Sequence, residues 1–295
     1  MIRRIRDPLH NLIQFNTKDE LEGALWRVLE TRPFQRLRRV KQLGFSDLVY
    51  PGASHSRFAH SVGVFQTARQ LMEVVRKHVG KRQESRENRA LAAALVHDLG
   101  HGPFSHAFEK VGDGLQLRLA DHEHMSDRLI RNSEVADILN EMGSGFACDV
   151  ADIIKKQGRW SVHNTVVSSQ FDADRLDYLR RDRLMSGTQH GGIDFEWLIA
   201  NLALRSVPFG IDESQVGTIE TFVIGPKAIQ AAEAFVLGLF QLYPTVYFHK
   251  ATRGAEKIFT ELLIRSSCSR GTMRLRLPDC RIIIRSFALR WSLIT

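Results

Sequence analysis

Hydrophobic positions recur at intervals of three and four along most of the chain, a spacing that predicts amphipathic helices. The first such stripe follows Asp19 and includes Leu21, Leu25 and Val28. A longer one begins at Ser61 and continues to Val79. Further helices are expected within 87–98, 168–184 and 225–243, the last with Pro226 in its first turn, where proline is tolerated.

Alternation with a period of two residues is rare, so few strands are expected. Residues 201–225 are the exception, and 216–224 is the best strand candidate in them. There is no internal repeat and no low-complexity linker. The pattern predicts an all-α, mainly helical domain with at most a small β-hairpin.

The last 31 residues break this pattern and define a separate segment. Residues 265–295 contain seven Arg, no Lys and one acidic residue, Asp279. Without them the chain has 34 basic and 32 acidic residues, so the net charge of +8 resides mainly in the tail. We therefore divide the chain into a body at 1–264 and an atypical Arg/Ser-rich tail at 265–295. For this tail, a solvated extension and a truncated or altered C-terminal region are the alternatives. The nearly neutral body gives little support for nucleic-acid binding.

Cysteine usage and hydropathy favour a cytoplasmic protein without a membrane partner. Cys148, Cys268 and Cys280 are odd in number and lack the spacing of a disulfide or zinc framework. The basic N-terminus is not followed by the apolar stretch of a signal peptide. The longest apolar stretch, 231–248, carries Glu233 and Pro244 and is more typical of a buried helix than of a membrane span.

Residues 94–109, ALVHDLGHGPFSHAFE, concentrate titratable groups at the end of an apolar run. Such groups are costly to bury unless they bind something. His97 and Asp98 end the preceding helix, His60 lies at the start of the neighbouring one, and Asp174 lies in another. Two imidazoles and two carboxylates suit one divalent ion, namely Mn, Mg, Fe, Zn, Ni or Co, and leave open positions for hydrolysis. Taken singly, an adjacent His–Asp pair is more often a polar helix end.

The order His…His-Asp…Asp resembles the signature of HD-superfamily metal phosphohydrolases. QLGFSDLVYPGASHSRFAHSVGV, HDLGHGPFSH, HEHMS, DADRLDYLRRD and YFHK occur in the order seen in HD-domain deoxynucleoside triphosphate (dNTP) triphosphohydrolases. These include the dGTP-activated sterile-alpha-motif subgroup. The resemblance covers residues 1–264 and implies an HD-domain fold and a dNTP substrate.

The resemblance also implies the chemistry: dNTPs are cleaved at the α-phosphorus to deoxynucleoside and tripolyphosphate. The implied metal ligands are His60, His97, Asp98 and Asp174. The implied catalytic group is His101, His106, Glu109 and His122. In it His106 protonates the departing 5′-oxygen, Glu109 fixes the tautomer of His106, and the other histidines face the phosphates.

Further residues match substrate contacts of the family. Asp182 and Gln42 match acceptors of the sugar 3′-hydroxyl, while Tyr247 and Leu43 match side chains that pack against C2′ and exclude a ribose hydroxyl. Four more residues match substrate contacts of the family, namely Arg57, Tyr178, His249 and Lys250. Core packing is the alternative for the two tyrosines and for His249, and solvated surface charge is the alternative for Arg57 and Lys250.

The segment ETRPFQRLRRVKQLG resembles the region where the subgroup binds an activating guanine nucleotide. Glu30 and Arg38 match its guanine contacts, although the family often has Asp at the first position. A basic helix face is the alternative. The resemblance also implies that dGTP activates the protein and that the chain forms a homo-oligomer, either a dimer or a tetramer.

Two other functions remain open. One is an HD phosphohydrolase that acts on a nucleoside monophosphate or a phosphodiester, against which the sugar-contacting set around Asp182 argues. The other is an inactive module that binds nucleotide or single-stranded nucleic acid, against which the complete ligand set argues.

Overall fold

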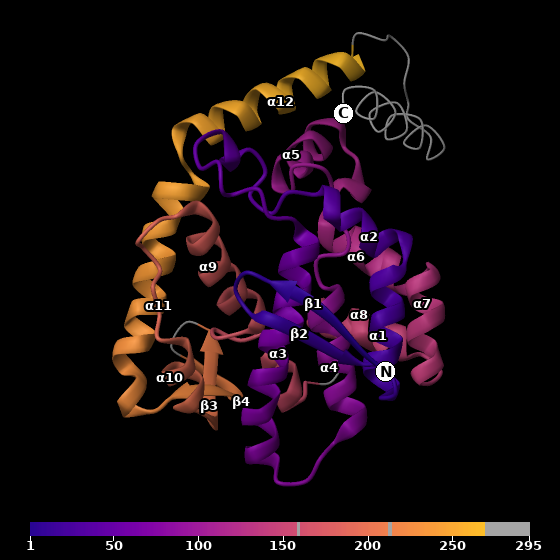
Figure 1. Ribbon diagram of the computed structural model, residues 1–295, viewed down its shortest axis with the longest axis vertical. Helices are drawn as coiled ribbons and strands as arrows, with labels where there is room; N and C mark the ends of the chain where they lie inside the picture. The colour runs from indigo at the N-terminus through magenta and orange to yellow at the C-terminus, as the bar shows by residue number, and fades with distance from the viewer. Residues whose placement is uncertain (158–159, 212–213, 269–295) are drawn as a thin grey trace.

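The computed structural model describes residues 1–157, 160–211 and 214–268. It is mainly helical, as predicted (Figure 1). The helices are α1 (Glu20–Glu30), α2 (Arg32–Arg36), α3 (Arg57–Val79), α4 (Glu84–Val96), α5 (His106–Leu115), α6 (His122–Arg131), α7 (Glu134–Leu139), α8 (Phe146–Ile154), α9 (Ala173–Ser186), α10 (Phe195–Ala200), α11 (Ile229–Leu242) and α12 (Lys250–Cys268). The strands are β1 (Ile2–Asp7), β2 (Asn11–Asn16), β3 (Leu202–Ile211) and β4 (Ser214–Ile224).

Helix α3 lies at the centre and packs against both α4 and α9. It begins at Arg57, four residues before the predicted start, because the Ser56 side chain caps it by accepting from the backbone N–H of Ala59. Phe65 of α3 is fully buried and stacks on Phe15 of β2, with ring centroids 5.0 Å apart. The central helix therefore carries the core and also positions His60, which lies in its first turn.

The remaining helix boundaries follow their capping residues. Asp19 caps α1 as expected. Helix α9 begins only at Ala173, since Asp172 is its cap. Helix α4 ends at Val96, so His97 and Asp98 lie in the turn that follows it rather than within the helix. A short 3₁₀ turn from Pro226 to Ala228 precedes α11.

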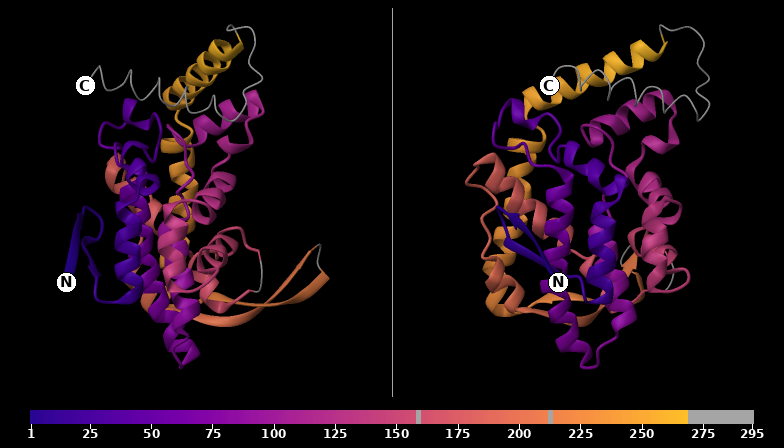
Figure 2. Two further views of the ribbon diagram at one scale, coloured as in Figure 1. Left: turned by 90° about the vertical axis from the view of Figure 1, so that its right-hand side faces the viewer. Right: turned by 45° about the vertical axis from the view of Figure 1, so that its right-hand side comes forward.

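The structure contains two antiparallel hairpins rather than one. Strands β3 and β4 pair over the predicted 201–225 region, from Leu202 opposite Ile224, and project from the body (Figure 2). Strands β1 and β2 form a second hairpin that the sequence pattern did not predict. Its buried apolar side chains are those of Ile13 and Phe15, both fully buried. Two residues form a period-two pattern that is too short to stand out beside the exposed arginines of β1.

Helix α12 packs against α5 near the end of the molecule where the site lies (Figure 1). Lys110 of α5 and Glu256 of α12 form an ion pair of 3.0 Å. The helix continues to Cys268, past the predicted boundary at 264, and the rest of the tail lies outside the described residues. Cys148 is an exposed free thiol, while the side chains of Cys268 and Cys280 are outside the description. No helix within the described ranges combines the length and apolarity needed to cross a bilayer.

Candidate active site

Three helices bring His60, His97 and Asp174 to one point. His60 comes from α3, His97 from the turn after α4, and Asp174 from the first turn of α9. The Nε2 of His60 lies 3.0 Å from Oδ1 of Asp174, and the Nε2 of His97 lies 3.6 Å from the same oxygen. The Nε2 of His97 is buried and has no hydrogen-bond partner among the described residues. Ligand atoms within 4.8 Å of one another, one of them without a partner, fit a divalent metal.

Asp98, the fourth predicted ligand, lies beside this group. Its carboxylate is 3.5 Å from Nε2 of His97 and 3.6 Å from Nε2 of His60. It also accepts from the Arg57 guanidinium and lies 3.3 Å from Nε2 of His101. Arg57 is thus buried against a predicted metal ligand rather than solvated at the surface.

The electrostatics of this group favour a cation. Burial lowers the pKa of His60, but the hydrogen bonds to Asp174 and Asp177 outweigh it and raise the pKa to about 10. Burial lowers the pKa of His97 as well, but Asp98 and Asp174 together outweigh it and raise the pKa. Burial opposes ionisation of Asp174, yet the two histidines hold its pKa well below the ordinary range. The carboxylates that attract these protons would equally attract a metal ion.

A second cluster adjoins the first and contains the whole predicted catalytic group. Glu109 of α5 accepts from Nδ1 of His106 at 2.9 Å and from Nδ1 of His122 at 2.6 Å. The rings of His101 and His122 stack, with centroids 4.0 Å apart. His101 is buried, whereas the side chain of His106 is 63% exposed and can meet a ligand.

These contacts separate the protonation states of the histidines. Burial and the charge of Arg57 lower the pKa of His101 to about 3, so this ring is neutral near pH 7. Burial lowers the pKa of His122, but the hydrogen bond to Glu109 and the charges of Glu109 and Asp98 together outweigh it and raise the pKa. At Glu109, the hydrogen bonds and charges of His106 and His122 together outweigh burial and hold the pKa of the carboxyl well below its ordinary range. The cluster therefore combines a neutral ring with a ring that readily carries charge.

The loop between the two clusters is strained and firmly held. Phe104 and Ser105 both have positive φ, 60° and 53°, which is costly for residues other than glycine. Ser105 accepts from Nε of Arg57 at 2.9 Å and donates to the carbonyl of Lys41 at 2.9 Å. Phe104 stacks on Phe45 with centroids 4.2 Å apart. These contacts fix the residue directly before His106.

Asp182, two helical turns after Asp174 on α9, meets Tyr247. The Tyr247 hydroxyl donates to Oδ2 of Asp182 at 2.8 Å, and Nε2 of His55 lies 2.9 Å from Oδ1. Tyr247 lies in a π-helical turn, Tyr243–Tyr247, a distortion often found at functional sites. The Oε1 of Gln42 is buried without a hydrogen-bond partner in the described part of the chain. An acceptor that lacks a donor suits a hydroxyl of a bound ligand.

The other predicted substrate contacts lie in different surroundings. Tyr178 lies between Asp174 and Asp182 on α9, and its ring centroid is 6.4 Å from that of Tyr247. Leu43 is half-buried against the core. His249 packs its ring edge-on to Tyr50, with centroids 6.1 Å apart. Lys250 is exposed at the start of α12.

The predicted activator residues lie apart from these clusters, around α1 and α2. The carboxylate of Glu30 accepts from the indole of Trp26 at 2.8 Å. The guanidinium of Arg38 lies over the Phe58 ring, 3.6 Å from its centroid, and Arg38 is itself exposed. Neither residue contacts a predicted metal ligand through a hydrogen bond or ion pair in the described structure.

Sequence reasoning missed two residues of the site. His55 precedes α3 and contacts Asp182, and Asp177 of α9 accepts from Nδ1 of His60 at 2.9 Å. Asp177 carried one available signal. It lies three residues after Asp174, and residues at this spacing share a helix face.

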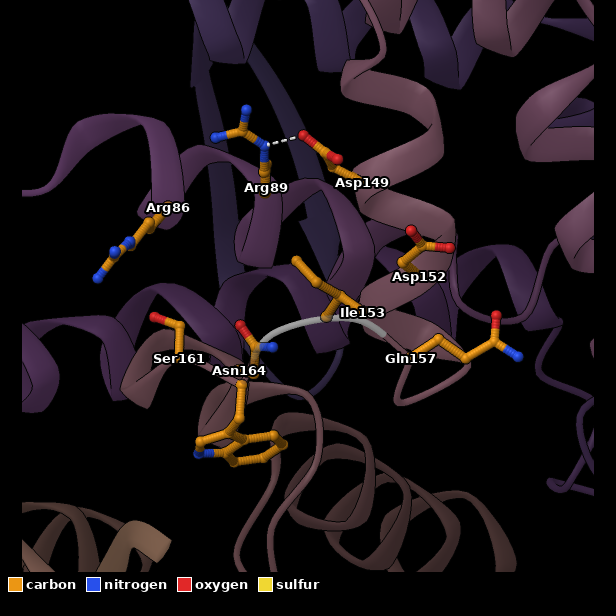
Figure 3. Close-up of a pocket in the computed structure, with 9 residues that line it drawn as sticks. Arg86, Arg89, Asp149, Asp152, Ile153, Gln157, Ser161 and Asn164 are labelled. Atoms are coloured by element: carbon orange, nitrogen blue, oxygen red, sulfur yellow. Dashed lines mark hydrogen bonds and ion pairs between the residues drawn. The ribbon is translucent and has the colours of Figure 1, made fainter.

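A separate pocket of about 290 Å³ lies between α4, α8 and the segment around Asn164 (Figure 3). In its wall, Arg89 pairs with Asp149 at 2.7 Å. It contains none of the predicted site residues. The chemistry-bearing side chains therefore gather in the histidine clusters and not in this pocket.

Comparison with known families agrees with this geometry. Residues 57–182 match the HD domain, which takes in His60, His97, Asp98, Asp174 and the histidine cluster. The chain contains an HD domain. Residues 193–275 match the HD associated region, so the two matches follow one another along the chain.

Individual relatives extend the similarity over most of the chain. An uncharacterized protein of Bacillus subtilis, YwfO, is 39% identical over 88% of this chain and 55% of its own length. The deoxynucleoside triphosphate triphosphohydrolase SAMHD1 of mouse is 27% identical over 90% of this chain and 44% of its own. A crystal structure of a phosphohydrolase from Bacteroides thetaiotaomicron superposes with a TM-score of 0.74 at 30% identity, covering 96% of this chain and 64% of that one. The chain spans about half the length of the curated relatives it matches.

Proposed function

We propose that the protein is a metal-dependent phosphohydrolase that cleaves dNTPs to deoxynucleoside and tripolyphosphate. The observation that carries the proposal is the 3.3 Å contact between Asp98 and His101, which joins the metal-ligand group to the histidine cluster. A phosphate bound at this junction would touch both groups. Similarity to a phosphohydrolase and to a dNTP triphosphohydrolase supports this class of reaction.

Each cluster then has a distinct task. A divalent ion held by His60, His97, Asp98 and Asp174 would polarise the α-phosphate and lower the pKa of water. His122, whose pKa is raised, donates to phosphate oxygens as a cation, and neutral His101 donates without adding charge. As an imidazolium, His106 would give its Nε2 proton to the 5′-oxygen as that oxygen departs, while its Nδ1–H stays hydrogen-bonded to Glu109. Glu109 accepts from Nδ1 of His106 and so directs the Nε2 of that ring outward.

The sugar would lie beside the Asp182–Tyr247 pair, whose 2.8 Å hydrogen bond leaves no space between the two side chains. The Oε1 of Gln42, which lacks a donor, and the carboxylate of Asp182 would accept a hydrogen bond from the 3′-hydroxyl. The ring of Tyr247 and the side chain of Leu43 would pack against C2′. A second hydroxyl at C2′ would then collide with the ring. In this proposal Tyr178 would flank the sugar, and Arg57, His249 and Lys250 would contact the triphosphate.

Activation by dGTP and assembly into a homo-oligomer belong to the same proposal. The exposed Arg38 can donate to the edge of a guanine, and Glu30 can accept from it. Hydrolysis of each dNTP is measured with and without dGTP, and the mass of the particle is followed by light scattering. Activation without a change in mass would separate the nucleotide effect from assembly.

Phosphorus NMR identifies the reaction. The protein is incubated with each dNTP and Mg²⁺, or with Mn²⁺ that is chelated before measurement. Tripolyphosphate as the phosphorus product establishes cleavage at the α-phosphorus. Orthophosphate or pyrophosphate would instead indicate a phosphohydrolase of another type, and tight nucleotide binding without product would indicate a binding module.

A further inference from the structure

His60 has one ring nitrogen toward the metal-ligand group and the other toward a second aspartate. Its Nε2 faces Asp174, and its Nδ1 lies 2.9 Å from Oδ2 of Asp177. Both aspartates project from α9, three residues apart. Asp177 is fully buried and is not among the ligand atoms that converge on the metal position. Its contact with His60 is therefore on the far side of the ring.

Asp177 is itself held from two other directions. It accepts from Nε of Arg181 at 2.8 Å, and its Oδ1 lies 2.8 Å from Nε2 of His10. Arg181 is fully buried and also donates to Asp7, at 2.8 Å. Every charged group in this set has an oppositely charged partner, which is the condition for burying such groups. The carboxylate of Asp177 therefore has little freedom to turn away from His60.

The packing of α3 against α9 is adapted to this pair. A Cβ atom on Gly63 would come within 2.1 Å of the Arg181 guanidinium and 2.2 Å of the Asp177 carboxylate. Gly63 lies three residues after His60 on α3, so it leaves the space that the pair occupies beneath the histidine. A hydrogen bond to a carboxylate fixes both the tautomer and the orientation of a metal-binding imidazole.

We propose that Asp177 is a positioning residue that holds His60 with Nδ1–H donated to the carboxylate and Nε2 directed at the metal. This inference rests on the metal centre of the proposed function. It also makes the turn between β1 and β2 a support of that centre, because Asp7 and His10 come from this turn. Asp7 accepts from the backbone N–H groups of Leu9 and His10, both at 2.9 Å, and so fixes the shape of the turn that reaches Asp177.

The test compares metal affinity in two matched variants of the full chain. Asp177→Asn removes the charge behind His60 and keeps the volume. Glu87→Gln removes another buried carboxylate, which pairs with Arg76 at 2.9 Å and touches no predicted site residue. Calorimetric titration with Mn²⁺ should show a Kd about 10- to 100-fold weaker for Asp177→Asn and unchanged for Glu87→Gln. Melting temperatures in chelator show how far each variant is destabilised without metal.

Equal Mn²⁺ affinity in wild type and folded Asp177→Asn would overturn the role of Asp177 and leave the metal centre intact. A wild-type chain that binds no Mn²⁺, Zn²⁺ or Mg²⁺ would overturn the metal centre, and this inference with it. If Asp177→Asn does not fold, ¹⁵N NMR of the Zn²⁺-loaded wild type decides, with the His60 signal assigned through His60→Gln. A protonated Nδ1 supports the proposal, and a protonated Nε2 refutes it.

Discussion

The hydroxyl of Tyr247 donates to the carboxylate of Asp182 over 2.8 Å, from a π-helical turn before α12 to the middle of α9. His55 occupies the other carboxylate oxygen at 2.9 Å, so Asp182 cannot rotate freely. The Tyr247 ring is fixed in turn, because both its hydroxyl and its backbone are held. A fixed ring at this position would exclude a bulky sugar substituent better than a mobile one.

The two functions of Tyr247 can be separated by substitution. Tyr247→Phe keeps the ring and removes a hydrogen bond to a charged group, which contributes about 1.5–3 kcal/mol to stability. We expect a lower melting temperature with the preference for dATP over ATP retained. Tyr247→Ala removes the ring and should reduce that preference about 10-fold or more, measured as the ratio of kcat/KM values. An unchanged ratio in Tyr247→Ala would place the sugar elsewhere.

Asp174 should be indispensable for metal binding. Its oxygen lies within 3.6 Å of both histidine Nε2 atoms, so Asp174→Ala removes a shared negative charge at the centre of the group. We expect the loss of metal affinity to exceed the about 10- to 100-fold typical of a residue behind a ligand. The measurement is metal content after dialysis against micromolar Mn²⁺. Asp127→Asn is the control, since the ion pairs of Asp127 in the described part of the chain are with Arg131 of its own helix, α6, and with Lys155, which follows α8.

The sequence predicted the helices for a clear physical reason, because apolar positions at intervals of three and four fix which helix faces are buried. The convergence of His60, Asp98 and Asp174 was predicted instead from the order of histidines and aspartates and its resemblance to the HD-superfamily signature. Asp177 was missed because an aspartate in a polar helix is ordinarily exposed. Only tertiary contacts with Arg181 and His10 reveal that it is buried. The β1–β2 hairpin was missed because the arginines of β1 outnumber the two buried apolar residues of the hairpin, Ile13 and Phe15.

The pH dependence of activity should reveal the pairing of His122 with Glu109. The hydrogen bond to Glu109 raises the pKa of His122 above its ordinary value despite burial. If charged His122 binds phosphate, kcat/KM falls as the pH rises through that pKa. Glu109→Gln removes the carboxylate that raises it, so the falling limb should move to lower pH. A profile with the same alkaline limb in Glu109→Gln would show that His122 does not act as a cation.

His106 should be required for turnover and not for metal binding. It is the exposed member of its cluster, it donates Nδ1 to Glu109 at 2.9 Å, and it does not belong to the group around Asp174. General acid catalysis typically contributes about 10²–10⁴-fold, so His106→Ala should lower kcat by that factor while metal content stays at the wild-type level.

The control for His106 is another exposed histidine of the same region. His124 of α6 has a side chain that is 50% exposed, and the ion pair given for it among the described residues is with Asp121, the cap of its helix, at 3.5 Å. His124→Ala should retain wild-type kcat and metal content. Wild-type turnover in His106→Ala would remove it from the reaction. Loss of metal together with turnover would instead mean that the two clusters form a single metal site, because all four members of the second cluster could also hold an ion.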